Sequence, residues 1–93
     1  MTVAVTAQSV PALRRGIKRH YDTARAQNVL LCPERVIVLD DIANAIAELC
    51  DGQHSVEMIS KILSDRYEGD PGLVEADVIE FIRELAEKGA VTA

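Results

Sequence analysis

A run of four apolar residues at 36–39 (Val-Ile-Val-Leu) is the clearest strand signal in the chain, because it lacks polar alternation and is rich in β-branched side chains. Pro33 cannot donate a hydrogen bond within a sheet, so it predicts a corner before a strand at Arg35–Leu39. Upstream, Gly16–Asp22 and Asn28–Cys32 predict a hairpin with a polar turn. We therefore expect three short strands first.

Two helices are predicted after the strands. Asp40 suits a helix N-terminus, and apolar residues then recur with helical period, which predicts a helix at about Asp41–Cys50. Ser55 is a typical N-cap for a second helix that ends near Tyr67. The residues expected to be buried are Ile42, Ile46, Leu49 and Cys50 in the first helix and Val56, Ile59, Ile62 and Leu63 in the second.

A third helix is predicted between two glycine-containing segments. Residues 68–72 (Glu-Gly-Asp-Pro-Gly) indicate a loop before it, and Gly89 indicates its end. Three strands followed by three helices favour an α+β fold, a small winged-helix-like domain at residues 13–93. Residues 1–12 offer little to pack, and we expect a flexible tail there. The expected core stripe of the third helix comprises Val74, Val78, Phe81, Ile82 and Leu85.

The composition argues against a nucleic-acid binder. Apolar residues make up 48% of the 93 residues, but only three residues are aromatic, which leaves no platform for stacking nucleobases. The predicted third helix carries Arg83 and Lys88 against five acidic residues, a net charge of −3, and a phosphate backbone would repel it. A winged-helix nucleic-acid binder remains only a weaker alternative that would have to use the basic hairpin.

Charge is distributed unevenly along the chain. Through Arg35 there are six Lys/Arg against two acidic residues, a net of +4, whereas the remainder has four basic and thirteen acidic residues, a net of −9. A basic end of this kind can dock on an oppositely charged protein, and Arg15, Lys18 and Arg19 are the candidate docking residues. Two ordinary solvated faces are the alternative interpretation.

No side-chain pattern indicates catalysis, a metal site or a bound cofactor. His54-Ser55 is a hydroxyl–histidine neighbour, but a serine at a helix start caps amides far more often than it attacks carbonyls. Asp40-Asp41 lacks a third hard ligand nearby, and Cys32 and Cys50 lack histidine at ligand spacing. We expect a protein that is not an enzyme, with two reduced cysteines. The first thirteen residues carry no charge and resemble no secretory signal, so we expect a cytoplasmic location.

The strand Arg35–Leu39 is the expected binding edge. Its apolar residues give it two hydrophobic faces, and the helices of so small a domain can cover only one face well. A peptide could pair with this edge and lay side chains into a groove against the third helix, where Ile79, Ile82 and Ala86 lie on one flank of the core stripe. A wider helical core or a homodimer face would explain the same residues.

The chain resembles the coenzyme PQQ synthesis protein D family, PqqD. The blocks Leu-Leu-Cys-Pro-Glu at 30–34 and Leu-Cys-Asp-Gly at 49–52 carry most of the resemblance, which covers nearly all of residues 14–91. Its other matching positions are Arg15-Gly16, Asp22, Arg25, Val29, Leu39, Ala43, Ile46, Ile59, Asp77-Val78 and Leu85.

The resemblance implies a peptide chaperone of pyrroloquinoline quinone biosynthesis, a recognition element for ribosomally made, modified peptides. Members bind the precursor peptide of the cofactor and present it to a radical S-adenosylmethionine enzyme. For this chain we expect a monomer or homodimer that binds neither nucleic acid nor membrane. An interaction or dimerisation module of another pathway is the alternative function. The residues that the resemblance assigns to peptide binding are Val36, Ile37, Val38, Leu39, Ile79, Ile82 and Arg83. The strand and helix flank predicted above add Arg35 and Ala86 to this set.

Overall fold

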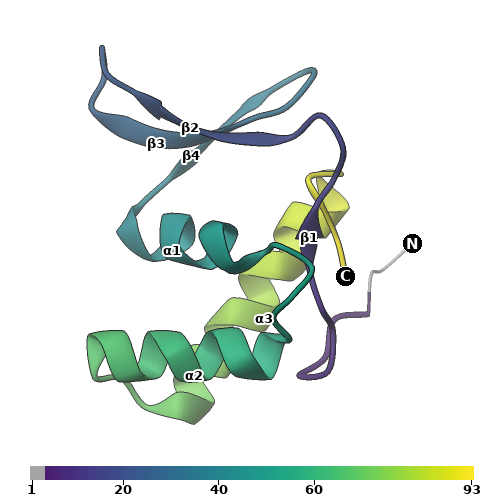
Figure 1. The fold of residues 1–93 in the computed structure, drawn as a ribbon, viewed down its shortest axis with the longest axis vertical. Helices are drawn as coiled ribbons and strands as arrows, with labels where there is room; N and C mark the ends of the chain where they lie inside the picture. The colour runs from purple at the N-terminus through teal and green to yellow at the C-terminus, as the bar shows by residue number, and fades with distance from the viewer. Residues whose placement is uncertain (1–3) are drawn as a thin grey trace.

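The computed structural model describes residues 4–93 as strands followed by helices (Figure 1). The chain order is β1 (Ala12–Leu13), β2 (Lys18–Asp22), β3 (Gln27–Leu31), β4 (Val36–Leu39), α1 (Asp41–Leu49), α2 (Val56–Tyr67), α3 (Pro71–Glu87) and β5 (Val91–Thr92). The α+β class and the three central strands before three helices are as expected from the sequence. Whether the domain is best described as a winged helix stays a prediction.

The central sheet has three antiparallel strands in the order β2-β3-β4. At the turn between β2 and β3, the Asp22 carboxylate accepts hydrogen bonds from the amides of Ala24 (3.1 Å) and Arg25 (3.3 Å), and Ala26 adopts a positive φ of 52°. Such side-chain bonds to the backbone favour a tight reversal of the chain. The predicted hairpin is confirmed.

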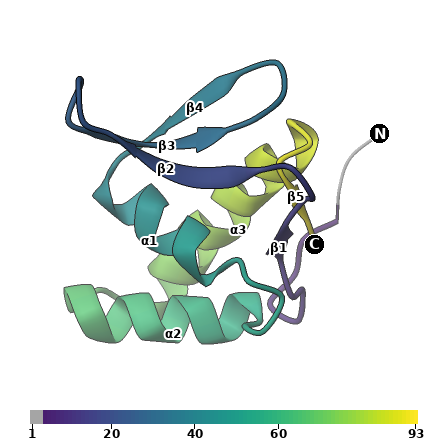
Figure 2. The ribbon, with the colours of Figure 1, turned by 45° about the horizontal axis from the view of Figure 1, so that its top comes forward.

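The register of the sheet gives it two distinct faces. Arg19, Leu30 and Ile37 form one cross-strand row, and Tyr21, Asn28 and Leu39 form the next. Directly paired residues share a face, and this face is turned toward the helices, because Leu30 and Leu39 belong to the core and the Arg19 Nη1 donates to Asn44 Oδ1 of α1 (3.3 Å). Figure 2 shows the sheet lying over α1 and α3.

Two helix starts agree with the predicted caps. The Asp40 carboxylate accepts from the amide of Ala43 (2.7 Å) at the start of α1, and the Ser55 hydroxyl accepts from the amide of Met58 (3.1 Å) at the start of α2. Such bonds satisfy backbone donors that have no partner within the helix.

The third helix begins earlier than predicted. Asp70 caps it, with its carboxylate accepting from the amides of Gly72 (2.9 Å) and Leu73 (3.3 Å), and Pro71 is its first residue. Proline at this position loses no hydrogen bond, because the first amides of a helix have no acceptor within it. The predicted loop at 68–72 is therefore wrong at Pro71 and Gly72.

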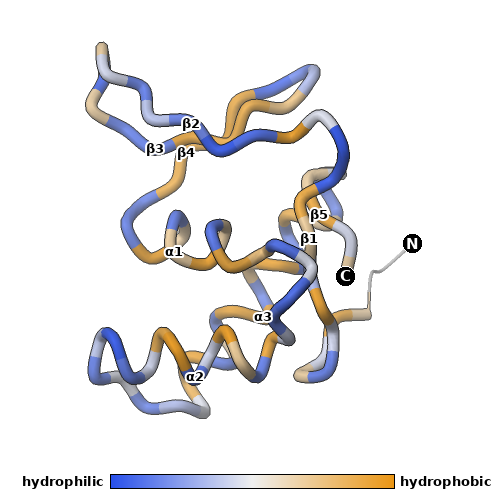
Figure 3. Tube along the Cα trace, in the orientation of Figure 1, coloured by the Kyte–Doolittle hydropathy of each residue, from blue (hydrophilic) through white to orange (hydrophobic). Residues whose placement is uncertain are grey.

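The core lies mainly among the three helices, and Leu30 and Leu39 close it on the side of the sheet. Apolar residues gather on the inward sides of these elements in Figure 3, where the tube is orange. Aliphatic side chains fill it, as the scarcity of aromatic residues predicts. The largest buried side chains are Leu30, Ile59, Ile82, Leu85, Val56 and Val78, together with Pro11.

The amino-terminal segment is packed, contrary to the prediction for residues 1–12. Val5 and Pro11 are buried, and the amides of Val56 and Glu57 donate to the carbonyls of Ser9 (2.8 Å) and Ala7 (3.0 Å). The segment thus supplies acceptors for the first two amides of α2, which have no acceptor within the helix. Residues 1–3 of the predicted tail lie outside the described residues.

A second, two-stranded sheet joins the ends of the domain. β1 pairs antiparallel with β5, with Ala12 opposite Thr92 and Leu13 opposite Val91. Val91 is buried, and Ala12 also forms an isolated bridge to Asp51. These two strands were not predicted, because each has two residues and neither shows a periodic pattern that could indicate a strand.

Candidate functional site

The strand β4 lies at an edge of the central sheet. It pairs with β3 on one side, and within residues 4–93 no strand pairs with its other side. The sequence-based expectation of an edge at this strand agrees with that arrangement. An edge strand presents backbone N–H and C=O groups that can pair with a further strand.

The register identifies which backbone groups of β4 are free. The amide of Cys32 donates to the carbonyl of Arg35 (3.0 Å), which makes these two residues a hydrogen-bonded pair. Hydrogen-bonded and non-hydrogen-bonded pairs alternate along antiparallel strands, so Ile37 and Leu39 direct their backbone groups toward β3. Val36 and Val38 therefore direct theirs toward the open edge.

An apolar groove begins where β4 ends. A hollow of about 160 Å³ is lined by residues from the start of α1 and by Asp77 and Phe81 of α3. Its α1-side lining is formed by Asp40, Ile42, Ala43 and Ile46. A second hollow of about 190 Å³ shares Ile42, Ile46 and Asp77 with the first and adds Leu63, Tyr67, Val74 and Val78. We call the two joined hollows the α1–α3 groove.

The groove offers mostly hydrophobic surface with three polar side chains, Asp40, Asp77 and Tyr67. Ile42 is 44% exposed and Tyr67 is 46% exposed, and both line the same hollow, so their exposed apolar atoms are grouped rather than scattered. Asp77 brings a carboxylate and Tyr67 a hydroxyl. Such a surface can take an aliphatic side chain and still bind a polar or basic neighbour beside it.

The other end of β4 also lies beside α3. A hollow of about 180 Å³ at the β3–β4 corner is lined by Ile17, Cys32, Pro33, Glu34, Arg35, Lys88 and Gly89. Phe81 and Lys88 thus mark the flank of α3 that runs beside β4, since residues seven apart lie on nearly the same side of a helix.

This geometry favours another groove wall than the predicted one. Ile82 is 0% exposed and belongs to the core, so its side chain cannot line an open groove. Ile79 and Arg83 each lie two residues from Phe81, which turns them by about 200° around the helix axis, away from β4. Ala86, five residues from Phe81, is turned away by about 140°. The sequence showed that apolar residues cover a wide side of this helix, but it did not show which flank of that side faces the sheet.

The predicted docking residues do not share one surface. Lys18 and Arg19 are neighbours in β2, and neighbouring side chains in a strand point to opposite faces. Arg19 bonds Asn44 on the inner face, so Lys18 points outward. Arg15 is exposed in the turn before β2.

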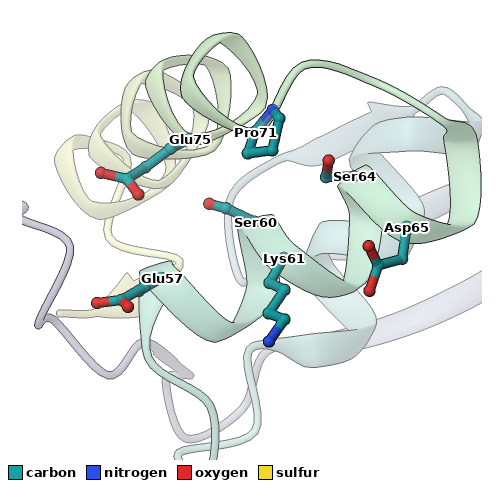
Figure 4. A pocket seen from close by; sticks show the side chains of 7 residues that line it. All are labelled: Glu57, Ser60, Lys61, Ser64, Asp65, Pro71 and Glu75. Carbon is teal, nitrogen blue, oxygen red and sulfur yellow. The ribbon is translucent and has the colours of Figure 1, made fainter.

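A further hollow is lined mainly by polar and charged residues and has a structural explanation. Figure 4 shows its lining residues, which come from α2 and the first turns of α3 and enclose about 400 Å³. The Ser60 hydroxyl donates to the carbonyl of Val56 (2.7 Å), and the Ser64 hydroxyl donates to that of Gly69 (2.6 Å). Both hydroxyls thus bond the backbone rather than a neighbouring base.

Three further reactive side chains, those of Cys50, Asp51 and His54, are also held in structural roles. The Cys50 Sγ lies 3.3 Å from the carbonyl of Ile46, and burial raises the pKa of this thiol to about 12. The hydrogen bond from His54 (2.9 Å) is the main cause of a lowered pKa at Asp51, and the hydrogen bond from the Gln53 amide lowers it further. Within residues 4–93, no cluster of three or more His, Cys, Asp or Glu could hold a metal ion.

A family model decides the relationship of the chain to known proteins. Residues 27–91 match the model described as "Coenzyme PQQ synthesis protein D (PqqD)". The chain belongs to the PqqD family. The matched residues include β3, β4 and all three helices, and therefore both the free edge and the α1–α3 groove.

Relatives of this PqqD-family chain extend over nearly its whole length. It is 44% identical to a PqqA binding protein of Xanthomonas oryzae, with 91% of this chain and 92% of that protein covered. It is 43% identical to a PqqA binding protein of Rhodopseudomonas palustris, with 97% and 88% covered. The bifunctional coenzyme PQQ synthesis protein C/D of Methylorubrum extorquens is 41% identical, with 91% of this chain covered, and the chain spans only 23% of its length.

Two solved structures share the fold. The solution structure of the PqqD truncation of Methylobacterium extorquens PqqCD, described as a functional and stand-alone recognition element for ribosomally synthesized and modified peptides, matches with a TM-score of 0.85 at 39% identity. That match covers 97% of this chain and 96% of the other. The crystal structure of PqqD from Xanthomonas campestris matches with a TM-score of 0.58 at 42% identity, covering 92% and 96%.

Proposed function

We propose that this PqqD-family domain binds the ribosomally made precursor peptide of pyrroloquinoline quinone and presents it to the radical S-adenosylmethionine enzyme that modifies it. The domain itself catalyses no reaction. The single observation that supports this most strongly is the open edge of β4, whose Val36 and Val38 have backbone groups directed away from β3. Relatives of nearly the same length are named for binding PqqA.

The peptide joins the sheet as a fourth strand on β4. Backbone hydrogen bonds at Val36 and Val38 align it, and they require no particular peptide sequence. Beyond Leu39 the peptide passes Ile42 and reaches the α1–α3 groove, where an apolar side chain is buried against Phe81 and Val74. Affinity then comes from the strand, and selectivity comes from the groove.

Proline substitution at Val38 tests the free edge. Val38→Pro removes one N–H that points outward, so the sheet keeps its own hydrogen bonds and the peptide loses a donor. We expect peptide affinity to fall about tenfold, since the ring also blocks the approach of the peptide backbone. Isothermal titration calorimetry with the precursor peptide measures the change.

The matched control is Val38→Thr, which shortens the apolar surface but keeps the N–H. The difference in affinity between the two variants isolates the backbone contribution. Circular dichroism must show that the proline variant is folded. A folded Val38→Pro domain that binds the peptide as tightly as Val38→Thr would contradict pairing at this edge.

A further inference from the structure

The face of the central sheet that points away from the helices carries an apolar surface with basic neighbours. The register places Lys18, Leu31 and Val36 in one cross-strand row and His20, Val29 and Val38 in the next. Directly paired residues share a face. We call these six residues the outer patch.

Five residues of the outer patch are exposed to solvent in this chain, and Val29 is buried, with 4% of its surface exposed. Val36 and Val38 are each 59% exposed, and Leu31 is 37% exposed. In Figures 1 and 2, no described element lies on this side of the sheet. A sheet that packs one face on its own helices usually carries polar residues on the other, so valines and a leucine here indicate a surface that another protein covers.

Charge around the patch indicates the chemistry of that protein. On this face of β2 the register places Lys18, His20 and Asp22, and the segments flanking β2 carry Arg14, Arg15 and Arg25, whereas Arg19 lies on the inner face. Asp22 lies on the same face, but its carboxylate is already bonded to the amides of its own turn and lies 4.0 Å from Arg25. Lys18 and His20 of the patch are exposed. A partner protein whose surface has an apolar centre and a rim of carboxylates is complementary to the outer patch.

We propose that the outer patch docks the enzyme that modifies the bound peptide, through such an acidic-rimmed apolar surface. This inference rests on the proposed function for its geometry. A peptide paired with β4 would continue the sheet, and every second side chain of it would project from the same face as Val36 and Val38. An enzyme seated on the patch would therefore contact the domain and the peptide together.

The shared surface has a thermodynamic consequence. Because the enzyme gains contacts when the peptide is present, it binds the loaded domain more tightly than the empty one. Linkage then requires that the enzyme raise the affinity of the domain for the peptide by the same factor. Both factors are measurable by titration.

The test uses a variant outside the peptide-binding strand. Lys18→Glu combined with Leu31→Thr reverses one charge and removes one apolar side chain of the patch, on β2 and β3. The matched control is Lys61→Glu with Met58→Thr, which makes the same kinds of change on the exposed side of α2. The probes are the purified radical S-adenosylmethionine enzyme of the pathway and the precursor peptide, titrated separately and together.

We expect the patch variant to lower affinity for the enzyme about tenfold or more, while its affinity for the peptide alone stays within about twofold. The control variant should change neither. A folded patch variant that binds the enzyme normally would overturn the proposal. So would a wild-type chain that sediments as a dimer and becomes monomeric in the patch variant, because a second copy would then cover the patch.

If the patch variant fails to fold, NMR chemical-shift mapping on the wild-type domain tests whether the enzyme binds the outer patch. Amide signals at 18–20, 29–31 and 36–38 should respond when the enzyme is added, and unchanged signals there would overturn the proposal. The peptide titration without enzyme reports on the proposed function by itself. Failure of peptide binding with enzyme binding retained would therefore refute that function and leave the docking surface standing.

Discussion

At the residue scale, position around a helix decides whether an apolar side chain supports the fold or a ligand. Ile79 and Ile82 have the same chemistry and are three residues apart in α3, yet Ile82 is fully buried and Ile79 only half-buried. Phe81, between them, faces the hollow beside the start of α1. One helical turn therefore contains a core residue, a residue on the far flank and a groove residue.

Alanine substitutions at these two isoleucines test that division. Ile82→Ala should lower the free energy of unfolding by about 2–5 kcal/mol, because it leaves a cavity in the core. Ile79→Ala should cost clearly less and should leave peptide affinity unchanged. Urea unfolding and peptide titration measure both. Weakened peptide binding in a stable Ile79→Ala domain would show that the flank of α3 that carries Ile79 lines the peptide groove.

Asp51 makes the stability of the domain depend on acid pH. Its pKa is lowered in the fold, first by the hydrogen bond from His54 and then by that from the Gln53 amide, so the folded state favours the carboxylate. The stabilisation is complete above the ordinary pKa near 3.8 and is lost as the pH falls through the lower folded value. This stabilisation is absent from a variant that lacks the carboxyl group of Asp51.

The measurement is a series of urea midpoints between about pH 5 and about pH 2 for the wild type and Asp51→Asn. The wild type should lose more stability than the variant across this range. Asp65→Asn, which removes an exposed carboxylate on α2, is the control. Equal losses for wild type and Asp51→Asn would show that the His54 contact contributes nothing to folding.

At the element scale, the amino-terminal segment acts as part of the helical layer. Its carbonyls at Ala7 and Ser9 accept from the first two amides of α2, and Ser55 accepts from the third. All three donors would otherwise have no partner within the helix. The segment also buries Val5 and continues into β1, which pairs with β5.

Deletion of residues 1–10 should therefore destabilise the domain by about 2 kcal/mol or more, from lost burial of Val5 and two lost hydrogen bonds. Denaturant unfolding of the shortened chain measures this loss. Val5→Ala in the full chain separates the burial contribution from the hydrogen bonds. A shortened chain as stable as the full one would show that the segment behaves as the flexible tail expected from its sequence.

At the scale of the whole molecule, the sheet and the helices divide two tasks. Residues 14–35, which contain β2, β3 and their turns, carry a net charge of +4, and the sheet presents two open surfaces, the β4 edge and the outer patch. The helices carry most of the acidic residues and most of the core. The α1–α3 groove forms where the two layers meet. None of the helices is long and apolar enough to cross a membrane, within the described residues.

Local pattern was sufficient to predict much of this fold. The β-branched run at 36–39, the caps at Asp40 and Ser55 and the period of the helices each act within a few residues, so they can be read directly. The position of β4 at the edge of the sheet was also predicted, because so small a domain has few elements that could cover both faces of an apolar strand. Membership of the PqqD family was predicted from the blocks at 30–34 and 49–52 and is confirmed.

Local sequence pattern was enough to predict β2, β3, β4 and the three helices, apart from the first residues of α3, as well as the charge distribution and the family. Which flank of α3 faces β4, the pairing of β1 with β5 and the packing of residues 4–12 against α2 became clear only from the folded chain. The reason is physical. Caps and periodicity arise from neighbours in the chain, whereas the rotation of a helix and the pairing of distant strands depend on how whole elements fill a shared core.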